Sequence, residues 1–133
     1  MADFKKLRVW QHARSLAFHA HHVAGRIRGS QYSSLRSQMI RAAMSIPANI
    51  VEGRSQASER EFTRFLRYAL ASASELEAHL IMAQDFGVIT ESDFLSLLSE
   101  VVDVRKMLHG LLDRLSKRKP VLQASSERAA DGD

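Results

Sequence analysis

Histidines and arginines are the residues of this chain whose types and spacing could carry chemistry. His19 and His22 are one helical turn apart and could share a metal ion, because the imidazole nitrogen is a common zinc ligand. No Asp or Glu lies within helical reach of the pair, and the chain has no cysteine to supply a thiolate. We therefore expect a solvated basic face here, with no metal and no cofactor.

Arg14 and His19 suggest acid–base cleavage of RNA. Their spacing resembles the R-x4-H pattern of helical HEPN ribonucleases, in which a histidine transfers protons beside an arginine that stabilises phosphate charge. Residues five apart in one continuous helix point about 140° away from each other. No Gly or Pro breaks the chain between these two residues. We expect no enzyme and no catalytic residue, and a HEPN-like ribonuclease is the weakest alternative.

The arginines are better candidates for a binding site. The expected nucleic-acid-binding residues are Arg36, Arg41, Arg54, Arg60, Arg64 and Arg67. The last three follow i, i+4, i+7 spacing and so share one helix face, opposite the apolar stripe of their segment. The aromatic residues fall mainly on core stripes, so we expect no stacking on bases. Contact with the nucleic-acid backbone, without reading of sequence, is the favoured interpretation.

Charge is distributed unevenly along the chain. Residues 1–70 hold twelve Lys and Arg against four Asp and Glu, a net charge of +8. Residues 71–118 hold five against eight, a net charge of −3, and residues 119–133 hold two against three. A folded protein of this kind could present one strongly positive surface that attracts polyanions. The alternative is an ordinary solubilising surface.

Length and composition indicate one small protein domain. The chain has 133 residues, of which 45% are hydrophobic, with two prolines and six glycines, a balance that favours helices. No apolar run approaches the roughly 18 residues that a membrane span needs. The first ten residues lack the apolar segment of a secretory signal. We expect a cytoplasmic protein with no membrane partner.

Four amphipathic helices are expected, at about residues 5–28, 34–52, 58–86 and 91–117. Ser58 to Glu61 and Thr90 to Asp93 have the pattern of N-terminal capping boxes, and Gly29 and Gly87 are stop signals. Short loops between long helices predict an all-α fold, an up-down-up-down antiparallel four-helix bundle over residues 1–118. Residues 119–133 lose the apolar periodicity and are expected to form a disordered tail.

The second helix has two apolar stripes. At 100° per residue, one stripe faces the expected core and contains Leu35, Met39, Ala42 and Ile46. The other consists of Ile40, Met44, Pro47 and Val51. In a monomer this second stripe would meet water, and contiguous apolar surface usually marks an interface. We therefore expect a homo-oligomer that buries these four residues between subunits.

Pro47 lies inside this helical pattern. A proline in a helix removes one hydrogen bond and frees a carbonyl one turn earlier. We expect a continuous, kinked helix in which Ser45, Asn49 and Glu52 form a polar network at the bend. Gly53 is expected to take the left-handed conformation that closes the helix.

Several motifs together resemble a family of bacterial four-helix bundles. The family includes proteins encoded in intervening sequences of the large-subunit ribosomal RNA, and the accessory variability protein of diversity-generating retroelements. The resemblance covers residues 4 to about 116 and rests on Leu7-x-x-Trp10-Gln11, Gln38-x-x-Arg41-Ala42-Ala43-x-Ser45-Ile46-x-x-Asn49, Glu52-Gly53, Phe62-x-x-Phe65-Leu66 and Glu75-Leu76-Glu77. It implies a ring-like homopentamer and, for the retroelement branch, a role in binding nucleic acid or a reverse transcriptase.

These observations favour a non-enzymatic, basic, homo-oligomeric adaptor that binds RNA or DNA, or a protein that processes nucleic acid. A purely structural or protein-interaction bundle without a nucleic-acid role is the main alternative.

Overall fold

The computed structural model describes residues 3–118 and shows four α-helices. They are α1 (Arg8–Gly25), α2 (Ser33–Arg54), α3 (Glu59–Asp85) and α4 (Glu91–Arg118), with short 3-10 helices η1 (Phe4–Lys6) and η2 (Ser30–Tyr32). No strand occurs among the described residues, so the all-α prediction is confirmed. The expected disordered tail, residues 119–133, lies outside them.

The first helix is shorter than expected because the backbone changes conformation at both of its ends. The Asp3 carboxylate accepts a hydrogen bond from the Lys5 amide and caps η1, and Leu7 is extended, which separates η1 from α1. After Gly25, the amides of Arg26 and Ile27 bond three residues back instead of four. The ends of the other three helices lie within two residues of the expected positions.

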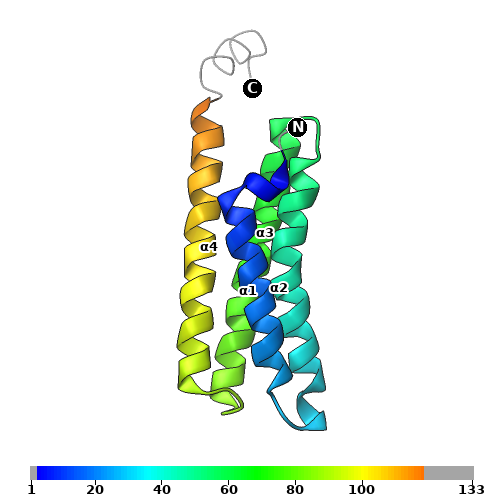
Figure 1. Ribbon diagram of the computed structural model, residues 1–133, viewed down its shortest axis with the longest axis vertical. Coiled ribbons are helices and arrows are strands. Elements are labelled where there is room, and N and C mark those ends of the chain that lie inside the picture. The colour runs from blue at the N-terminus through cyan, green and yellow to red at the C-terminus, as the bar shows by residue number, and fades with distance from the viewer. Residues whose placement is uncertain (1–2, 119–133) are drawn as a thin grey trace, which may run out of the picture.

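The four helices pack side by side along most of their length (Figure 1). The loops after α1 and α3 lie at the lower end of the view, and the loop between α2 and α3 lies at the upper end. Each helix contacts the next one in the chain, and α1 also contacts α4. Each helix buries one apolar stripe; the largest fully buried side chains are Leu16, Met39, Ile46, Ile50, Leu66, Leu76, Leu80, Leu97 and Leu108.

Local capping explains where α3 and α4 begin and where α3 ends. The Ser58 hydroxyl accepts from the Glu61 amide at 3.2 Å, and the Thr90 hydroxyl accepts from the Asp93 amide at 3.0 Å. Gly87, with φ of 72°, allows the Val88 amide to reach the Ala83 carbonyl at 3.1 Å, the pattern of a Schellman cap. The carboxylate of Glu61 does not return to the Ser58 amide as a full capping box requires, because it binds Arg64.

Helix α2 continues through Pro47, with polar side chains arranged beside it. The side-chain amide of Asn49 donates to the backbone carbonyl of Ser45 at 2.8 Å and to the Ser45 hydroxyl at 3.0 Å. That hydroxyl lies 2.7 Å from the hydroxyl of Ser72 on α3, which is buried. The polar group therefore links the proline turn of α2 to the neighbouring helix.

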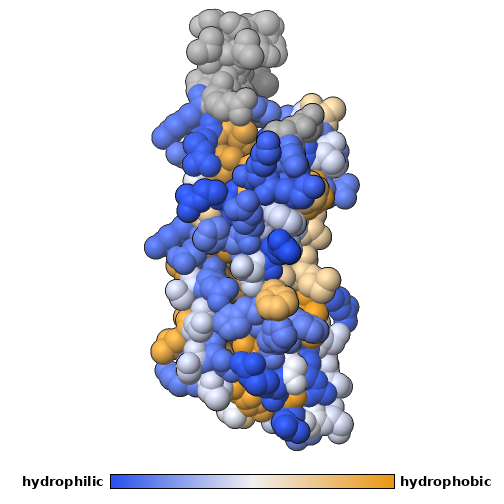
Figure 2. Space-filling view, in the orientation of Figure 1, coloured by the Kyte–Doolittle hydropathy of each residue, from blue (hydrophilic) through white to orange (hydrophobic). Residues whose placement is uncertain are grey.

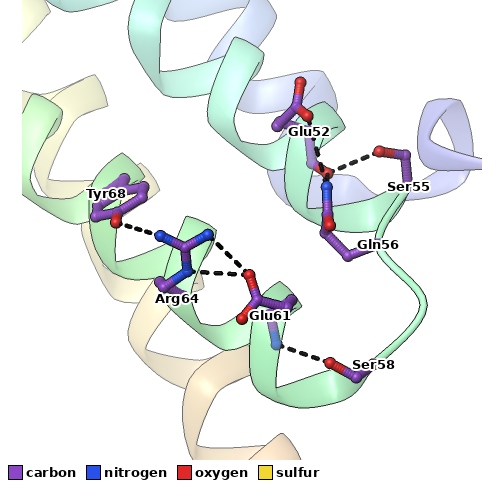
Figure 3. A network of polar contacts seen from close by, with 7 residues as sticks. All are labelled: Glu52, Ser55, Gln56, Ser58, Glu61, Arg64 and Tyr68. Carbon is purple, nitrogen blue, oxygen red and sulfur yellow. Dashed lines mark hydrogen bonds and ion pairs between the residues drawn. The ribbon is translucent and has the colours of Figure 1, made fainter.

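Glu52, the third residue expected in this group, lies elsewhere. It is seven residues beyond Ser45, or about 10 Å along the helix axis. The backbone carbonyl of Glu52 accepts from the Ser55 hydroxyl at 2.8 Å and from the side-chain amide of Gln56 at 3.0 Å, as Figure 3 shows. The side chain is exposed. Ser72, which the sequence reasoning missed, completes the group in its place.

Gly53 was expected to be left-handed, and the structure corrects this. Only Gly29 and Gly87 have positive φ among the described residues, whereas Gly53 lies within α2 and is buried. A Cβ atom at Gly53 would lie 2.7 Å from the Phe65 Cβ and 3.0 Å from a ring carbon of Phe62. The glycine is therefore needed for the close approach of α2 to α3.

Gly53→Ala should lower the free energy of unfolding by about 1–3 kcal/mol, since the added methyl group overpacks a contact with a side-chain Cβ atom that cannot rotate away. Gly110→Ala on α4 is the matched control. Its new Cβ would meet nothing nearer than the Arg114 guanidinium at 3.6 Å, so it should raise stability by about 0.5–1 kcal/mol. Urea denaturation of both variants measures the difference; equal effects would contradict the close approach.

Asn49→Ala should lower the free energy of unfolding by about 1–3 kcal/mol, because it removes the side-chain amide that donates to the partly buried carbonyl and hydroxyl of Ser45. Glu52→Ala is the control, and as an exposed change outside this group it should stay within about 0.5 kcal/mol of the parent protein. Matching denaturation midpoints for the two variants would show that the Ser45–Asn49 contact does not stabilise α2.

Candidate nucleic-acid interface

Four of the six expected arginines gather around the end of the bundle where α2 passes into α3. Arg54 is the last residue of α2, and Arg60, Arg64 and Arg67 follow on the first turns of α3. The three on α3 are exposed, whereas Arg54 is half-buried. We refer to these four residues as the arginine end.

Arg36 lies far from the arginine end and stabilises a loop. It is 18 residues before Arg54, which corresponds to about 27 Å along α2. Its guanidinium donates to the carbonyls of Ile27 at 2.9 Å and Gly29 at 3.0 Å, in the connection between α1 and α2. Both carbonyls lie in this connection, and that of Gly29 also accepts from the Tyr32 amide at 3.1 Å, so the role of Arg36 is to hold the turn between the two helices.

Arg41 lies between these two positions. It is exposed and donates to the Ser37 hydroxyl at 3.2 Å. Together with Gln38, Ser45 and Glu75 it lines a shallow polar groove between α2 and α3. The six predicted residues thus do not form one continuous patch on a single protomer.

Arg54 is held by an aromatic ring. The centre of its guanidinium lies 5.5 Å from the centroid of the Phe62 ring, within the range of a cation–π contact. Its Nε atom is buried and has no hydrogen-bond partner. Because Phe62 belongs to the core, this contact ties the end of α2 to the first turn of α3.

Arg64 is held in place by three hydrogen bonds, drawn in Figure 3, and by two aromatic rings. It donates to the Glu61 carboxylate at 3.0 and 2.8 Å and to the Tyr68 hydroxyl at 2.7 Å. Its guanidinium carbon lies 5.0 Å from the Phe65 ring centroid and 5.4 Å from that of Tyr68. The hydrogen bonds that Arg64 donates to Glu61, and then to Tyr68, raise the pKa of Arg64 above its ordinary value. An arginine is charged at any physiological pH, and Glu61 largely balances the charge of Arg64.

Arg60 and Arg67 differ from Arg64 in having no hydrogen bond or ion pair within the described residues. Both are exposed on α3 and seven residues apart, which places them on the same helix face about 10 Å from each other. Their charges are not balanced by a bonded carboxylate. The positive charge that the arginine end can offer to a phosphate therefore rests chiefly on these two residues.

The aromatic residues beside the arginines correct the expectation that aromatics lie on core stripes. Phe62 is buried, but Phe65 is half-buried and Tyr68 retains 42% of its surface. Sequence reasoning missed Tyr68 as a partner of Arg64. The i, i+4 spacing of the two residues was the signal that could have found it.

The second apolar stripe of α2 lies at the protein surface. Met44 is 58% exposed, and Ile40, Pro47 and Val51 are half-buried. Met44 and the 68% exposed Phe18 of α1 line a shallow groove of about 660 Å³ between the two helices. Figure 2 shows hydrophobic side chains reaching the surface among hydrophilic ones on the face viewed there.

The histidine and arginine of the R-x4-H pattern face different helices. His19 Nδ1 lies 2.5 Å from a carboxylate oxygen of Glu100 on α4, whereas Arg14 lines the groove towards α2 and lies 5.7 Å from the Trp10 ring centroid. Helix α1 is unbroken between them. The structure thus supplies His19 with a carboxylate that reasoning along one helix could not find. No group of three or more metal-ligating side chains occurs in the described part of the chain.

The described residues form four α-helices and no strand, and four arginines gather at one end of these helices. With a net charge of +4, the chain is a small basic helical protein. The family model of the 23S rRNA-intervening sequence proteins matches residues 5–110, and the chain belongs to this family. The family resemblance noted in the sequence is thereby confirmed.

A solved structure supports the same fold. The crystal structure of a protein of unknown function from the S23 ribosomal protein family of Bacteroides thetaiotaomicron has a TM-score of 0.73 and 24% sequence identity to this chain. The match covers 78% of this chain and 97% of the other. No curated protein matches. None of the helices among the described residues has both the length and the apolar character needed to cross a membrane.

Proposed function

We propose that this protein is a non-enzymatic, homo-oligomeric adaptor that binds the backbone of RNA or DNA through its arginine end. The observation that carries the proposal is the pair Arg60 and Arg67, two exposed cations on one face of α3 with no bonded carboxylate. Arginine suits this task because its planar fork donates several hydrogen bonds to phosphate oxygens. Backbone contacts of this kind position a protein on nucleic acid without reading its sequence.

Two arginines on one protomer contribute little positive charge, and assembly of several subunits would multiply it. We propose that the protein is an up-down-up-down antiparallel bundle in the cytoplasm and, from the family resemblance, a homopentamer. The exposed Met44 and the half-buried Ile40, Pro47 and Val51 support an interface on α2, because burial of apolar surface stabilises association. A ring would repeat Arg60 and Arg67 once per subunit.

A protein-interaction role without nucleic acid is the second candidate. The groove that Phe18 and Met44 line favours it, since exposed apolar surface can also receive a partner protein. A reverse transcriptase or another nucleic-acid-processing protein fits the retroelement branch of the resemblance. A partner in this groove, which lies between α1 and α2, would leave the exposed arginines of α3 accessible, but it would compete with the proposed oligomer interface for Met44.

Replacing both Arg60 and Arg67 with Gln should weaken binding to RNA and DNA of any sequence. It should also flatten the dependence of affinity on salt. Each lost phosphate contact should reduce the slope of log affinity against log salt by about 0.9 on duplex DNA and 0.7 on single strands. Fluorescence anisotropy with labelled oligonucleotides at several salt concentrations measures both effects.

Arg28→Gln is the matched control for this experiment. Arg28 is equally exposed and lies in the connection at the opposite end of the bundle, so the variant should bind as the parent protein does. Circular dichroism checks that all variants remain helical. A parent protein that fails to bind at low salt, or a double variant with unchanged slope, would move the adaptor role to a protein partner.

Met44→Glu should shift the protein towards monomers while its helical content persists, because it places a charge in a surface that the oligomer would desolvate. Leu95→Glu is the control. Leu95 is 52% exposed on α4, outside the proposed interface, and its replacement should leave the mass unchanged. Multi-angle light scattering reports the mass of each; a monomeric parent protein would rule out the proposed interface.

A further inference from the structure

Tyr68 is an exposed aromatic residue set among the arginines of α3. It follows Arg64 by one turn and directly succeeds Arg67. The three aromatic residues along this part of α3 run from core to surface: Phe62 is 3% exposed, Phe65 is half-buried, and Tyr68 is 42% exposed. The outermost ring therefore offers aromatic surface to a ligand while the inner rings anchor the helix.

The orientation of the Tyr68 ring is held by its neighbours. Its hydroxyl accepts the 2.7 Å hydrogen bond from Arg64, and the guanidinium lies over the ring at 5.4 Å. Phe65 meets the ring at an angle of 88°, with 5.4 Å between the centroids. Glu61 in turn holds Arg64 through two hydrogen bonds, as drawn in Figure 3. A ring held in this way loses little conformational entropy when a ligand stacks on it.

The helix that carries Tyr68 also carries cations for the nucleic-acid backbone. Arg60 and Arg67, which have no hydrogen bond or ion pair within the described residues, are on the same helix as Tyr68. A fixed aromatic surface flanked by free cations is the combination by which proteins hold single strands: bases stack on the ring and phosphates meet the cations. Duplex nucleic acid cannot use the ring, because its bases are already stacked and paired.

We infer that Tyr68 is a stacking platform for an unpaired base, so that the arginine end prefers single-stranded RNA or DNA to duplexes. The inference rests on the proposed function and specifies its ligand. Arg67, which directly precedes Tyr68, and Arg60, about 12 Å from it along the axis of α3, contact phosphates of the same strand, and Arg64 keeps the ring in place. Every base has an aromatic face, so the preference is for unpaired strands and not for a sequence.

The test compares the full chain with its Tyr68→Leu and Tyr68→Phe variants on a single-stranded uridine 20-mer, a single-stranded adenosine 20-mer and a 20-base-pair duplex. Tyr68→Leu should weaken single-strand binding about 5- to 100-fold and leave duplex binding unchanged. Tyr68→Phe should bind within about twofold of the parent, because it keeps the ring. Phe86→Leu is the matched control, a 50% exposed aromatic next to the far end of α3, and should have no effect.

A second measurement identifies the contact directly. Single strands that carry 5-iodouridine should form a photo-crosslink to Tyr68 under ultraviolet light, which peptide mass spectrometry would locate. The inference is overturned if Tyr68→Leu binds single strands as the parent does, or if the crosslink lies elsewhere.

The outcomes separate the two proposals. Equal, salt-dependent binding of duplexes and single strands by the parent protein would retain the phosphate contact and reject the stacking platform. Failure of the parent to bind any of the three oligonucleotides at low salt would reject the proposed function itself.

Discussion

The close approach of α2 to α3 is the constraint on which the other features of this protein depend. Gly53 has no side chain where the Cβ of Phe65 and the ring of Phe62 arrive, so the two helices can meet there at short distance. Further along the same pair, the hydroxyls of Ser45 and Ser72 form a 2.7 Å hydrogen bond across the interface. Gly53 at the end of α2 and the Ser45–Ser72 hydrogen bond nearer its middle together determine how α3 packs on α2.

This packing positions the arginine end. Phe62 and Phe65 lie at the contact with Gly53, and their rings hold the guanidinium groups of Arg54 and Arg64. The charges are thus divided into two kinds. Arginines that stack on aromatics or pair with Glu61 organise the surface, and exposed arginines without such partners are available to a ligand. Counting positive charges along the chain treats both kinds alike, which is why the net charge of residues 1–70 overstates the charge that a ligand meets.

Much of the fold was predictable because its signals are local. Ser58 and Thr90 cap their helices by bonding amides three residues away, and Gly87 closes α3 through bonds within six residues. The apolar periodicity likewise assigns the buried side of each helix, since it depends only on 100° per residue. The first helix is shorter than expected because Asp3 caps a separate 3-10 turn and Leu7, which follows it, is extended, although the Leu7 side chain itself does not prevent a helical conformation.

The sequence by itself determined four amphipathic helices, their capped ends, and a second apolar stripe on α2, because each follows from contacts within about two turns. Only the tertiary structure decided that Gly53 serves helix packing, that Ser72 replaces Glu52 beside Ser45, and that His19 meets Glu100 of α4. It also decided that Arg36 serves a loop while Arg60 and Arg67 are left without bonded partners. These outcomes depend on the rotation and height at which one helix meets another, which arise from the packing of all four helices together.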